Sequence, residues 1–96
     1  MILMTGNDLK VEYRDGNKVL ALSGKLDSST ARGFADQVLS RCDCAVTMDL
    51  TDLKYISSAG IRAIVLVNKT IPVNIIGASG LVAEVLEISG MDKILG

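Results

Sequence analysis

Histidine is absent from this chain, and only two cysteines occur, Cys42 and Cys44. Without histidine, a Ser–His–Asp catalytic triad is excluded. The two cysteines, which flank Asp43, cannot by themselves complete the four-ligand set that a structural zinc ion usually takes. We therefore expect no metal site and no cofactor, and we expect both cysteines to be reduced and buried as small apolar side chains.

Long apolar runs and clusters of positive charge are also missing. The longest uninterrupted apolar run, Ala63–Val67, is far shorter than the ~20 residues that a transmembrane helix needs. Met1–Met4 lacks the length and the basic start of a secretion signal. The net charge is −1, and without a Lys/Arg cluster there is no electrostatic footprint for nucleic acid. We expect a cytoplasmic protein that neither inserts into a membrane nor binds nucleic acid.

The motifs of common enzyme classes are absent as well. No glycine-rich nucleotide-binding loop occurs, and Gly77–Gly80 is not the Gly-x-Ser-x-Gly elbow of serine hydrolases. A dyad of Ser57 or Ser58 with Lys54 would need a desolvated lysine, whereas Lys54 is expected in a polar loop where its amine stays protonated. We therefore identify no catalytic residue and expect a protein that is not an enzyme.

What the chain does contain is apolar residues in regular patterns. It has 96 residues, of which 49% are hydrophobic and 22% charged, as in one folded globular domain spanning residues 1–96. Leu9–Tyr13 and Lys18–Leu22 alternate apolar with polar or small residues around Arg14–Asn17, which contains the tight-turn pair Asp-Gly. This pattern predicts an N-terminal β-hairpin.

A helix is predicted from just after Asp27 to about Arg41. Asp27 is placed to accept hydrogen bonds from the first unpaired N–H groups of this helix. Apolar residues follow the spacing of one buried face, which makes the helix amphipathic and able to pack on a sheet. These residues are Ala31, Phe34, Ala35, Val38 and Cys42.

The second half of the chain alternates strands with helices. Ala45–Leu50 and Val73–Gly77 are rich in strand formers and are predicted to be inner strands. A helix is predicted between them, from about Ser58 to Lys69, and a last helix from Ser79 or Gly80 to about Ile88. The fold class that follows is α/β: a mixed β-sheet with an N-terminal hairpin and parallel strands, and helices packed on it.

In such a fold, right-handed crossovers place the strand-to-helix loops along one edge of the sheet, where binding sites commonly lie. These loops are Gly24–Asp27, Thr51–Ser58 and Gly77–Gly80. Ser57 and Ser58 stand in the second loop at the start of a helix, where a serine can cap the helix, bind an anion or be phosphorylated. Ala59 and Gly60 are small enough to let that helix pack closely on the sheet.

The segment Asp49–Arg62, with the sequence Asp-Leu-Thr-Asp-Leu-Lys-Tyr-Ile-Ser-Ser-Ala-Gly-Ile-Arg, resembles the signature of STAS domains, the bacterial anti-sigma factor antagonists. Leu20–Thr30 resembles the second strand and first helix entry of the family, and Val85–Leu95 resembles its C-terminal end. The resemblance therefore extends over nearly the whole chain. It implies the STAS fold.

The resemblance also implies roles for residues near the serines. Alignment on Gly60 puts Ser58 at the phosphoacceptor position of the family, where the preceding residue is typically aspartate and is Ser57 here. Ala59 replaces a serine found in many members. From their positions, Asp27 at the first helix entry and Arg62 one turn into the second predicted helix, these two residues are expected to flank the serines on the same edge. The partner-binding residues would then be Asp27, Ser57, Ala59, Gly60 and Arg62.

The implied function is that of an anti-sigma factor antagonist, monomeric when free. The unmodified domain would bind a protein that is both anti-sigma factor and serine kinase, which frees a sigma factor. Phosphorylation of Ser58 would end that binding, and a phosphoserine phosphatase would restore it. Two alternatives stay open: an accessory subunit without a switch that docks on the cytoplasmic ATPase of a transporter, and a small-ligand sensor that uses the loop edge as a pocket.

Overall fold

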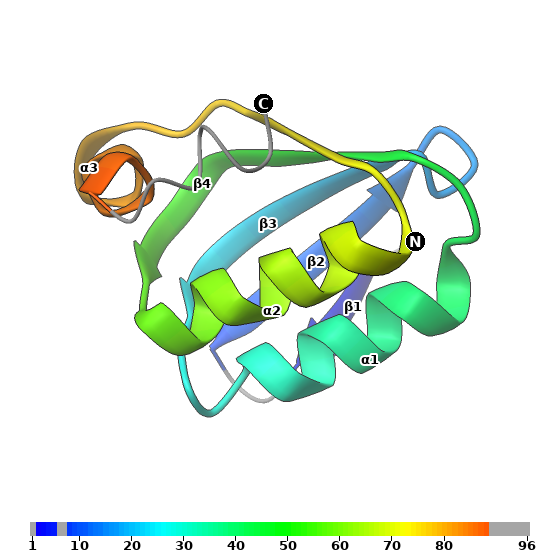
Figure 1. The fold of residues 1–96 in the computed structure, drawn as a ribbon, viewed down its shortest axis with the longest axis horizontal. Helices are drawn as coiled ribbons and strands as arrows, with labels where there is room; N and C mark the ends of the chain where they lie inside the picture. Colours follow the sequence, from blue (N-terminus) through cyan, green and yellow to red (C-terminus); the bar gives the residue numbers. More distant parts are fainter. Residues whose placement is uncertain (1, 6–7, 89–96) are drawn as a thin grey trace.

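The computed structural model describes residues 2–5 and 8–88 of the chain, which form one five-stranded sheet and three helices (Figure 1). The elements are β1 (Ile2–Thr5), β2 (Leu9–Arg14), β3 (Val19–Leu26), α1 (Ala31–Arg41), β4 (Val46–Ile56), α2 (Ser58–Thr70), β5 (Val73–Ile76) and α3 (Gly80–Ile88). The strand order is β1-β2-β3-β4-β5, with β1–β2 and β2–β3 antiparallel and the other two pairs parallel. The predicted mixed α/β fold is confirmed.

The turn between β2 and β3 has the backbone that its sequence favours. Asp15, Gly16 and Asn17 all have positive φ angles, a conformation that glycine adopts freely and that Asn and Asp tolerate better than other residues. The N–H of Lys18 donates a hydrogen bond of 3.2 Å to the carbonyl oxygen of Arg14 and closes the turn. The predicted N-terminal hairpin is therefore present.

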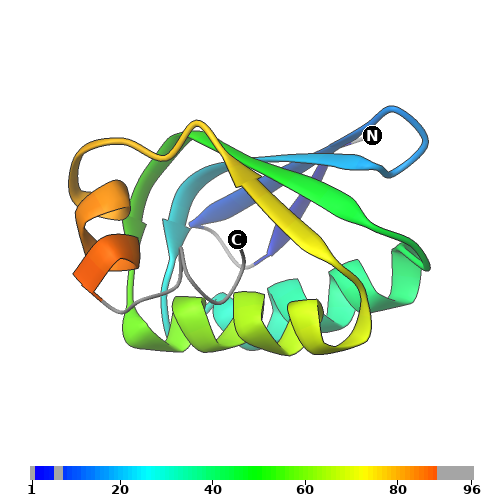
Figure 2. The ribbon, with the colours of Figure 1, turned by 45° about the horizontal axis from the view of Figure 1, so that its top comes forward.

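Helices α1 and α2 lie side by side against one face of the sheet (Figures 1 and 2). All five apolar positions predicted for the buried face of α1 are buried. The core between the helices and the sheet includes fully buried side chains from four elements: Phe34 of α1, Leu20 of β3, Met48 of β4 and Ile64 of α2. Burial of each such side chain stabilises the fold by roughly 1.5–3 kcal/mol.

The edges of the sheet differ from the prediction. Val73–Ile76 forms β5, which within the described part of the chain pairs only with β4 and is an edge strand, so the prediction that it is an inner strand is wrong. Val73 is the one residue of this strand that is buried. The opposite edge is β1, a short strand that the sequence patterns did not indicate and that pairs with β2.

Strand β4 is also longer than predicted. It continues past Leu50 to Ile56, so most of the expected loop Thr51–Ser58 is strand. The pairing with β3 shifts register between Ala21 and Ser23, and Thr51 and Asp52 are both exposed. This irregularity interrupts the alternation of buried and exposed residues from which a strand is recognised in sequence.

The two cysteines have different surroundings. Both are free thiols, but Cys42 is buried while Cys44 is exposed, so the prediction of burial is wrong for Cys44. The thiol of Cys42 donates a hydrogen bond to the carbonyl oxygen of Asn17, and burial raises its pKa. In the ranges 2–5 and 8–88, no helix is long and apolar enough to cross a membrane.

Candidate functional site at the start of helix α2

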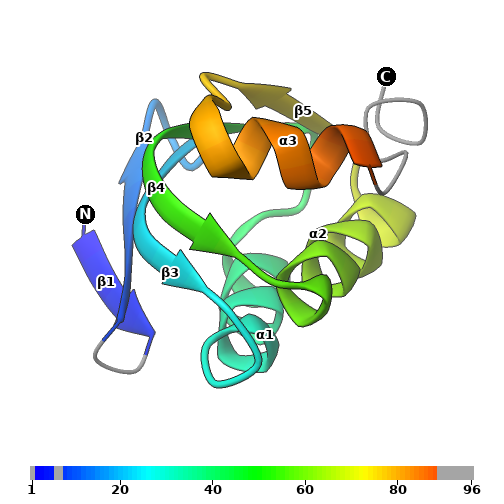
Figure 3. The same cartoon turned by 90° about the vertical axis from the view of Figure 1, so that its left-hand side faces the viewer.

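The ends of β3 and β4 meet at the point where α2 begins (Figure 3). Leu26 and Ile56, the last residues of these parallel strands, are paired in register. The chain after Leu26 leads to α1, and the chain after Ile56 leads directly into α2. Asp27 and Ser57 are therefore brought to the same end of the sheet, as predicted from the topology.

Ser57 is the N-cap of α2. Its hydroxyl oxygen accepts a hydrogen bond of 3.3 Å from the N–H of Gly60, and its carbonyl oxygen accepts one of 3.0 Å from the N–H of Ile61. Its own N–H donates to the carbonyl oxygen of Leu26 at 3.0 Å, which ties the helix start to β3. Of the three roles that the sequence leaves open for a serine here, capping belongs to Ser57.

Gly60 lets α2 approach the sheet closely. A Cβ atom at this position would overlap the carbonyl oxygen of Leu26 and lie 2.9 Å from Cγ1 of Ile56, so no larger side chain fits without a shift. Because Gly60 is buried, its role at this surface is to position the neighbouring residues. The expectation that small residues allow close packing is confirmed here.

Ser58, Ala59 and Arg62 form the accessible part of the helix start. Ser58 is the first residue of α2 and is exposed, as is Arg62 one turn later, whereas Ala59 is half-buried against the core. Among the residues that the structure describes, the Ser58 hydroxyl and the Arg62 guanidinium have no hydrogen bond or ion pair. Their polar groups are available to a partner molecule.

Asp27 stabilises the connection between β3 and α1. Its carboxylate accepts hydrogen bonds from the N–H of Ser29 at 3.0 Å and from the Ser29 hydroxyl at 2.7 Å, and these bonds hold its pKa below the usual value. Helix α1 begins later, at Ala31, whose N–H is bound by the Asp27 main-chain oxygen. The prediction that the Asp27 side chain caps the helix is therefore wrong, because α1 begins about one turn after Asp27.

Thr30 is a residue of this connection that sequence reasoning missed. It is only 1% exposed, and its hydroxyl donates to the carbonyl oxygen of Lys25 at 3.0 Å and accepts from the N–H of Asp27 at 2.9 Å. The run Asp-Ser-Ser-Thr contains the signal, because each of its residues can hydrogen-bond to nearby backbone.

The loop Gly77–Gly80 does not join the serines. Gly77 lies against Asp49 and Thr51, in the middle of β4, because β5 ends at Ile76, the partner of Asp49. Strand β4 then runs on to Ile56 without a β5 neighbour. The prediction that all three strand-to-helix loops gather at one place is therefore correct for two of them.

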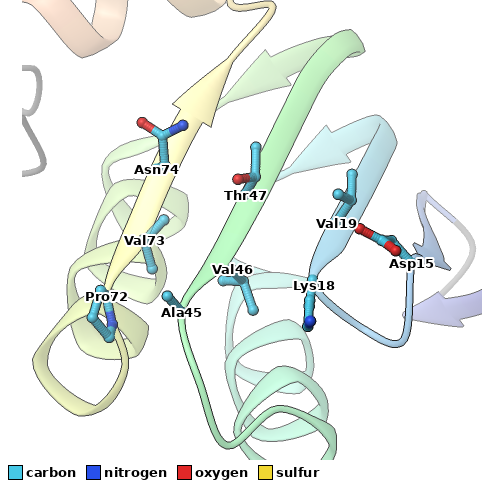
Figure 4. A pocket seen from close by; sticks show the side chains of 9 residues that line it. All are labelled: Asp15, Lys18, Val19, Ala45, Val46, Thr47, Pro72, Val73 and Asn74. Atoms are coloured by element: carbon cyan, nitrogen blue, oxygen red, sulfur yellow. The ribbon is translucent and has the colours of Figure 1, made fainter.

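A hollow of about 400 Å³ lies at the other end of the sheet, near the β2–β3 turn and the starts of β4 and β5 (Figure 4). Its polar lining includes Lys18 and Asn74, which are exposed, and Thr47, which is half-buried. It thus lacks the buried converging polar groups of a specific ligand pocket and is separate from the serines. A sensor pocket was expected at the loop edge, and this hollow lies elsewhere.

The fold is shared with two solved structures. One is a candidate anti-sigma factor antagonist from Thermotoga maritima, with a TM-score of 0.75 and 21% sequence identity over 88% of this chain and 82% of that one. The other is an anti-sigma factor antagonist from Mycobacterium paratuberculosis, with a TM-score of 0.70 and 18% identity over 96% and 86% of the two chains. At these identities, the likeness defines a class of α/β fold.

The family follows from the sequence comparison. The family model described as "Mlab, STAS domain" matches residues 9–96, which is most of the chain. The protein therefore belongs to the STAS domain family, as the Asp49–Arg62 segment led us to expect. No curated protein matches the chain in sequence.

Proposed function

We propose that this protein is an anti-sigma factor antagonist that works in the cytoplasm. In its unmodified form, it binds a protein that is both anti-sigma factor and serine kinase, and a sigma factor is released. The surface that binds is the start of α2 together with Asp27. Support comes from the STAS family membership and from the fold shared with one anti-sigma factor antagonist and one candidate anti-sigma factor antagonist.

The observation that supports a phosphorylation switch is that the two serines have different environments. Ser57 is half-buried and its hydroxyl caps α2, whereas Ser58 is exposed and its hydroxyl makes no hydrogen bond in the described part of the chain. A kinase that transfers the terminal phosphoryl group of ATP to Ser58 Oγ, with ADP and a proton as the other products, would disturb no bond of the fold. Ser58 is therefore the phosphoacceptor of this proposal.

Phosphorylation would change what this surface can bind. It adds roughly −1.5 to −2 charges at the first residue of a helix, where negative charge is favourable, so the domain stays folded. A partner packed around Ala59 would meet both a charge and a larger group. Hydrolysis of the phosphate by a phosphoserine phosphatase would restore binding.

Isothermal titration calorimetry with a kinase-like anti-sigma factor from the same organism tests the proposal. We expect Ser58→Ala to bind like the native protein and Ser58→Asp to bind at least tenfold more weakly, a difference of about 1.4 kcal/mol. Ser79→Asp is the matched control, because Ser79 is also an exposed serine immediately before a helix and lies outside this surface. Equal affinities of Ser58→Ala and Ser58→Asp would rule out the switch.

Asp27 and Arg62 are proposed to set the specificity of the same surface. Both flank the serines, and charges at the rim of an interface contribute to specificity and association rate more than to affinity. Reversal of either charge should slow association without unfolding the domain. Variants that fold and bind at the native rate would remove the residue from the interface.

A second candidate function is a docking subunit without a switch, which binds the cytoplasmic ATPase of a transporter. The observation in its favour is Ser57, which stands where the family typically has an aspartate. Such a subunit would use the same surface and stay unphosphorylated. Titration of Ser58→Ala and Ser58→Asp with the transporter ATPase would then give a single affinity, and transporter genes would neighbour its gene.

A further inference from the structure

Arg62 follows Ser58 by four residues on the exposed side of α2. Residues four apart in an α-helix are neighbours, with about 5–6 Å between their Cβ atoms. Both side chains are exposed, and neither has a hydrogen bond or ion pair within residues 2–5 and 8–88. The guanidinium of Arg62 can therefore reach a group attached to the Ser58 oxygen without breaking an interaction within the described residues.

On helix α2, no other charged residue near Ser58 competes with Arg62 or repels a negative group at Ser58. Helix α2 contains no acidic residue, and its second cation, Lys69, lies eleven positions after Ser58, at the far end of the helix. The elements beside the helix start contribute Lys25 and Asp27 from the end of β3, Lys54 from β4 and Arg32 from α1. Of these charges, Arg62 alone is fixed one helical turn from Ser58.

We propose that Arg62 is the internal counter-ion of a phosphate on Ser58, an inference that rests on the proposed function. An acidic group four residues before a basic one is the favourable order in a helix. Arginine suits this role because its planar guanidinium donates two parallel hydrogen bonds to a phosphate, which lysine cannot do. The pair would form within the domain, without any partner.

The pairing gives the switch a second component. In the unmodified domain, Arg62 is free to bind a carboxylate of the partner, and in the phosphorylated domain the same guanidinium is held by the phosphate. Phosphorylation thus adds a negative charge to the surface and also withdraws the positive charge of Arg62 from the partner. The partner that fits this description presents an acidic side chain opposite Arg62.

The test needs only this protein, made with phosphoserine at position 58 by genetic encoding. The second ionisation of the phosphate is followed by ³¹P NMR as the pH is changed. Because Arg62 stabilises the dianion, its replacement in Arg62→Gln should raise the pKa of that ionisation by about 0.3 unit. Lys69→Gln removes the same charge from the same helix at a distance and should leave the pKa unchanged.

The Lys54→Gln variant tests whether Lys54, rather than Arg62, is the counter-ion of the phosphate. Equal pKa values in the native and Arg62→Gln phosphoproteins, or a rise produced by Lys54→Gln instead, would overturn the role of Arg62. Either result leaves the proposed function intact, because that function depends on modification of Ser58 in cells and on partner binding, which are measured separately.

Discussion

The hydroxyl of Ser57 accepts a hydrogen bond from the Gly60 N–H, whereas the hydroxyl of Ser58 has no bond in the described part of the chain. Two neighbouring residues of the same type thus have different environments because the helix begins between them. The N-cap residue points its side chain back at the helix start, while the first helical residue points outward. The sequence predicts that both serines lie here, but the hydrogen bonds decide which one is available.

Replacement of Ser57 should affect stability according to its capping ability. Ser57→Ala removes the acceptor for the Gly60 N–H and should lower the free energy of unfolding by about 1 kcal/mol. Ser57→Asp restores the residue typical of the family, keeps an acceptor and places a negative charge at the helix start, so it should be at least as stable as the native protein. Urea unfolding of the three proteins measures both effects. A destabilised Ser57→Asp would contradict this role.

Gly60 should tolerate no side chain. Gly60→Ala would force a Cβ into the carbonyl oxygen of Leu26 and the side chain of Ile56, and overpacking of this kind costs about 2 kcal/mol. Gly33→Ala is the matched control, because Gly33 is an exposed glycine inside α1, where alanine should stabilise the helix by about 0.5–1 kcal/mol. Thermal unfolding should therefore shift in opposite directions for the two variants.

At the scale of elements, regular periodicity was the reliable signal. The spacing of Phe34, Ala35 and Val38 predicts the buried face of α1, and Asp15-Gly16 predicts the hairpin turn. The extension of β4 to Ile56 could not be read in this way, because two register shifts against β3 accompany two pairs of consecutive exposed residues, Thr51–Asp52 and Lys54–Tyr55. The position of β5 in the strand order could not be predicted from the sequence either, because its apolar run suits an edge strand and an inner strand alike.

The connection between β3 and α1 should contribute to acid sensitivity. The Asp27 carboxylate has a lowered pKa in the folded protein because Ser29 donates two hydrogen bonds to it. Its stabilising effect is therefore fully present above the unfolded pKa of about 3.9 and is lost as the pH falls through the lower folded pKa. Asp27→Asn should make unfolding less dependent on pH in this range. Ser29→Ala should produce a smaller change in the same direction, measured by urea unfolding between pH 6 and pH 2.5.

At the scale of the whole molecule, the candidate binding surface and the hollow lie at opposite ends of the sheet. The sequence predicts which residues follow β3 and β4, and parallel pairing of these strands brings Asp27 and Ser57 together. It could not predict that Gly77 stays beside the middle of β4, because this depends on the length of a neighbouring strand. The site is thus formed by the two segments that follow β3 and β4.

Two exposed apolar side chains allow a test of which surface the partner covers. Leu66, on α2, is 49% exposed and lies one turn after Arg62, while Ile76, on the edge strand β5, is 45% exposed. A partner that docks along α2 should lose about tenfold in affinity with Leu66→Ser, because an apolar contact is removed, and should be insensitive to Ile76→Ser. Both substitutions are at the surface, so folding should be unaffected. The reverse pattern in calorimetry would place the partner on β5.

The central claim is that Ser58 is a regulated phosphoacceptor. Mass spectrometry of the peptide that spans Lys54–Arg62, from protein purified out of its own growing and stressed cells, tests it most directly. We predict phosphate on Ser58 and none on Ser57, in a proportion that changes with growth conditions. A peptide that stays unmodified under all conditions would contradict the switch and favour the docking subunit.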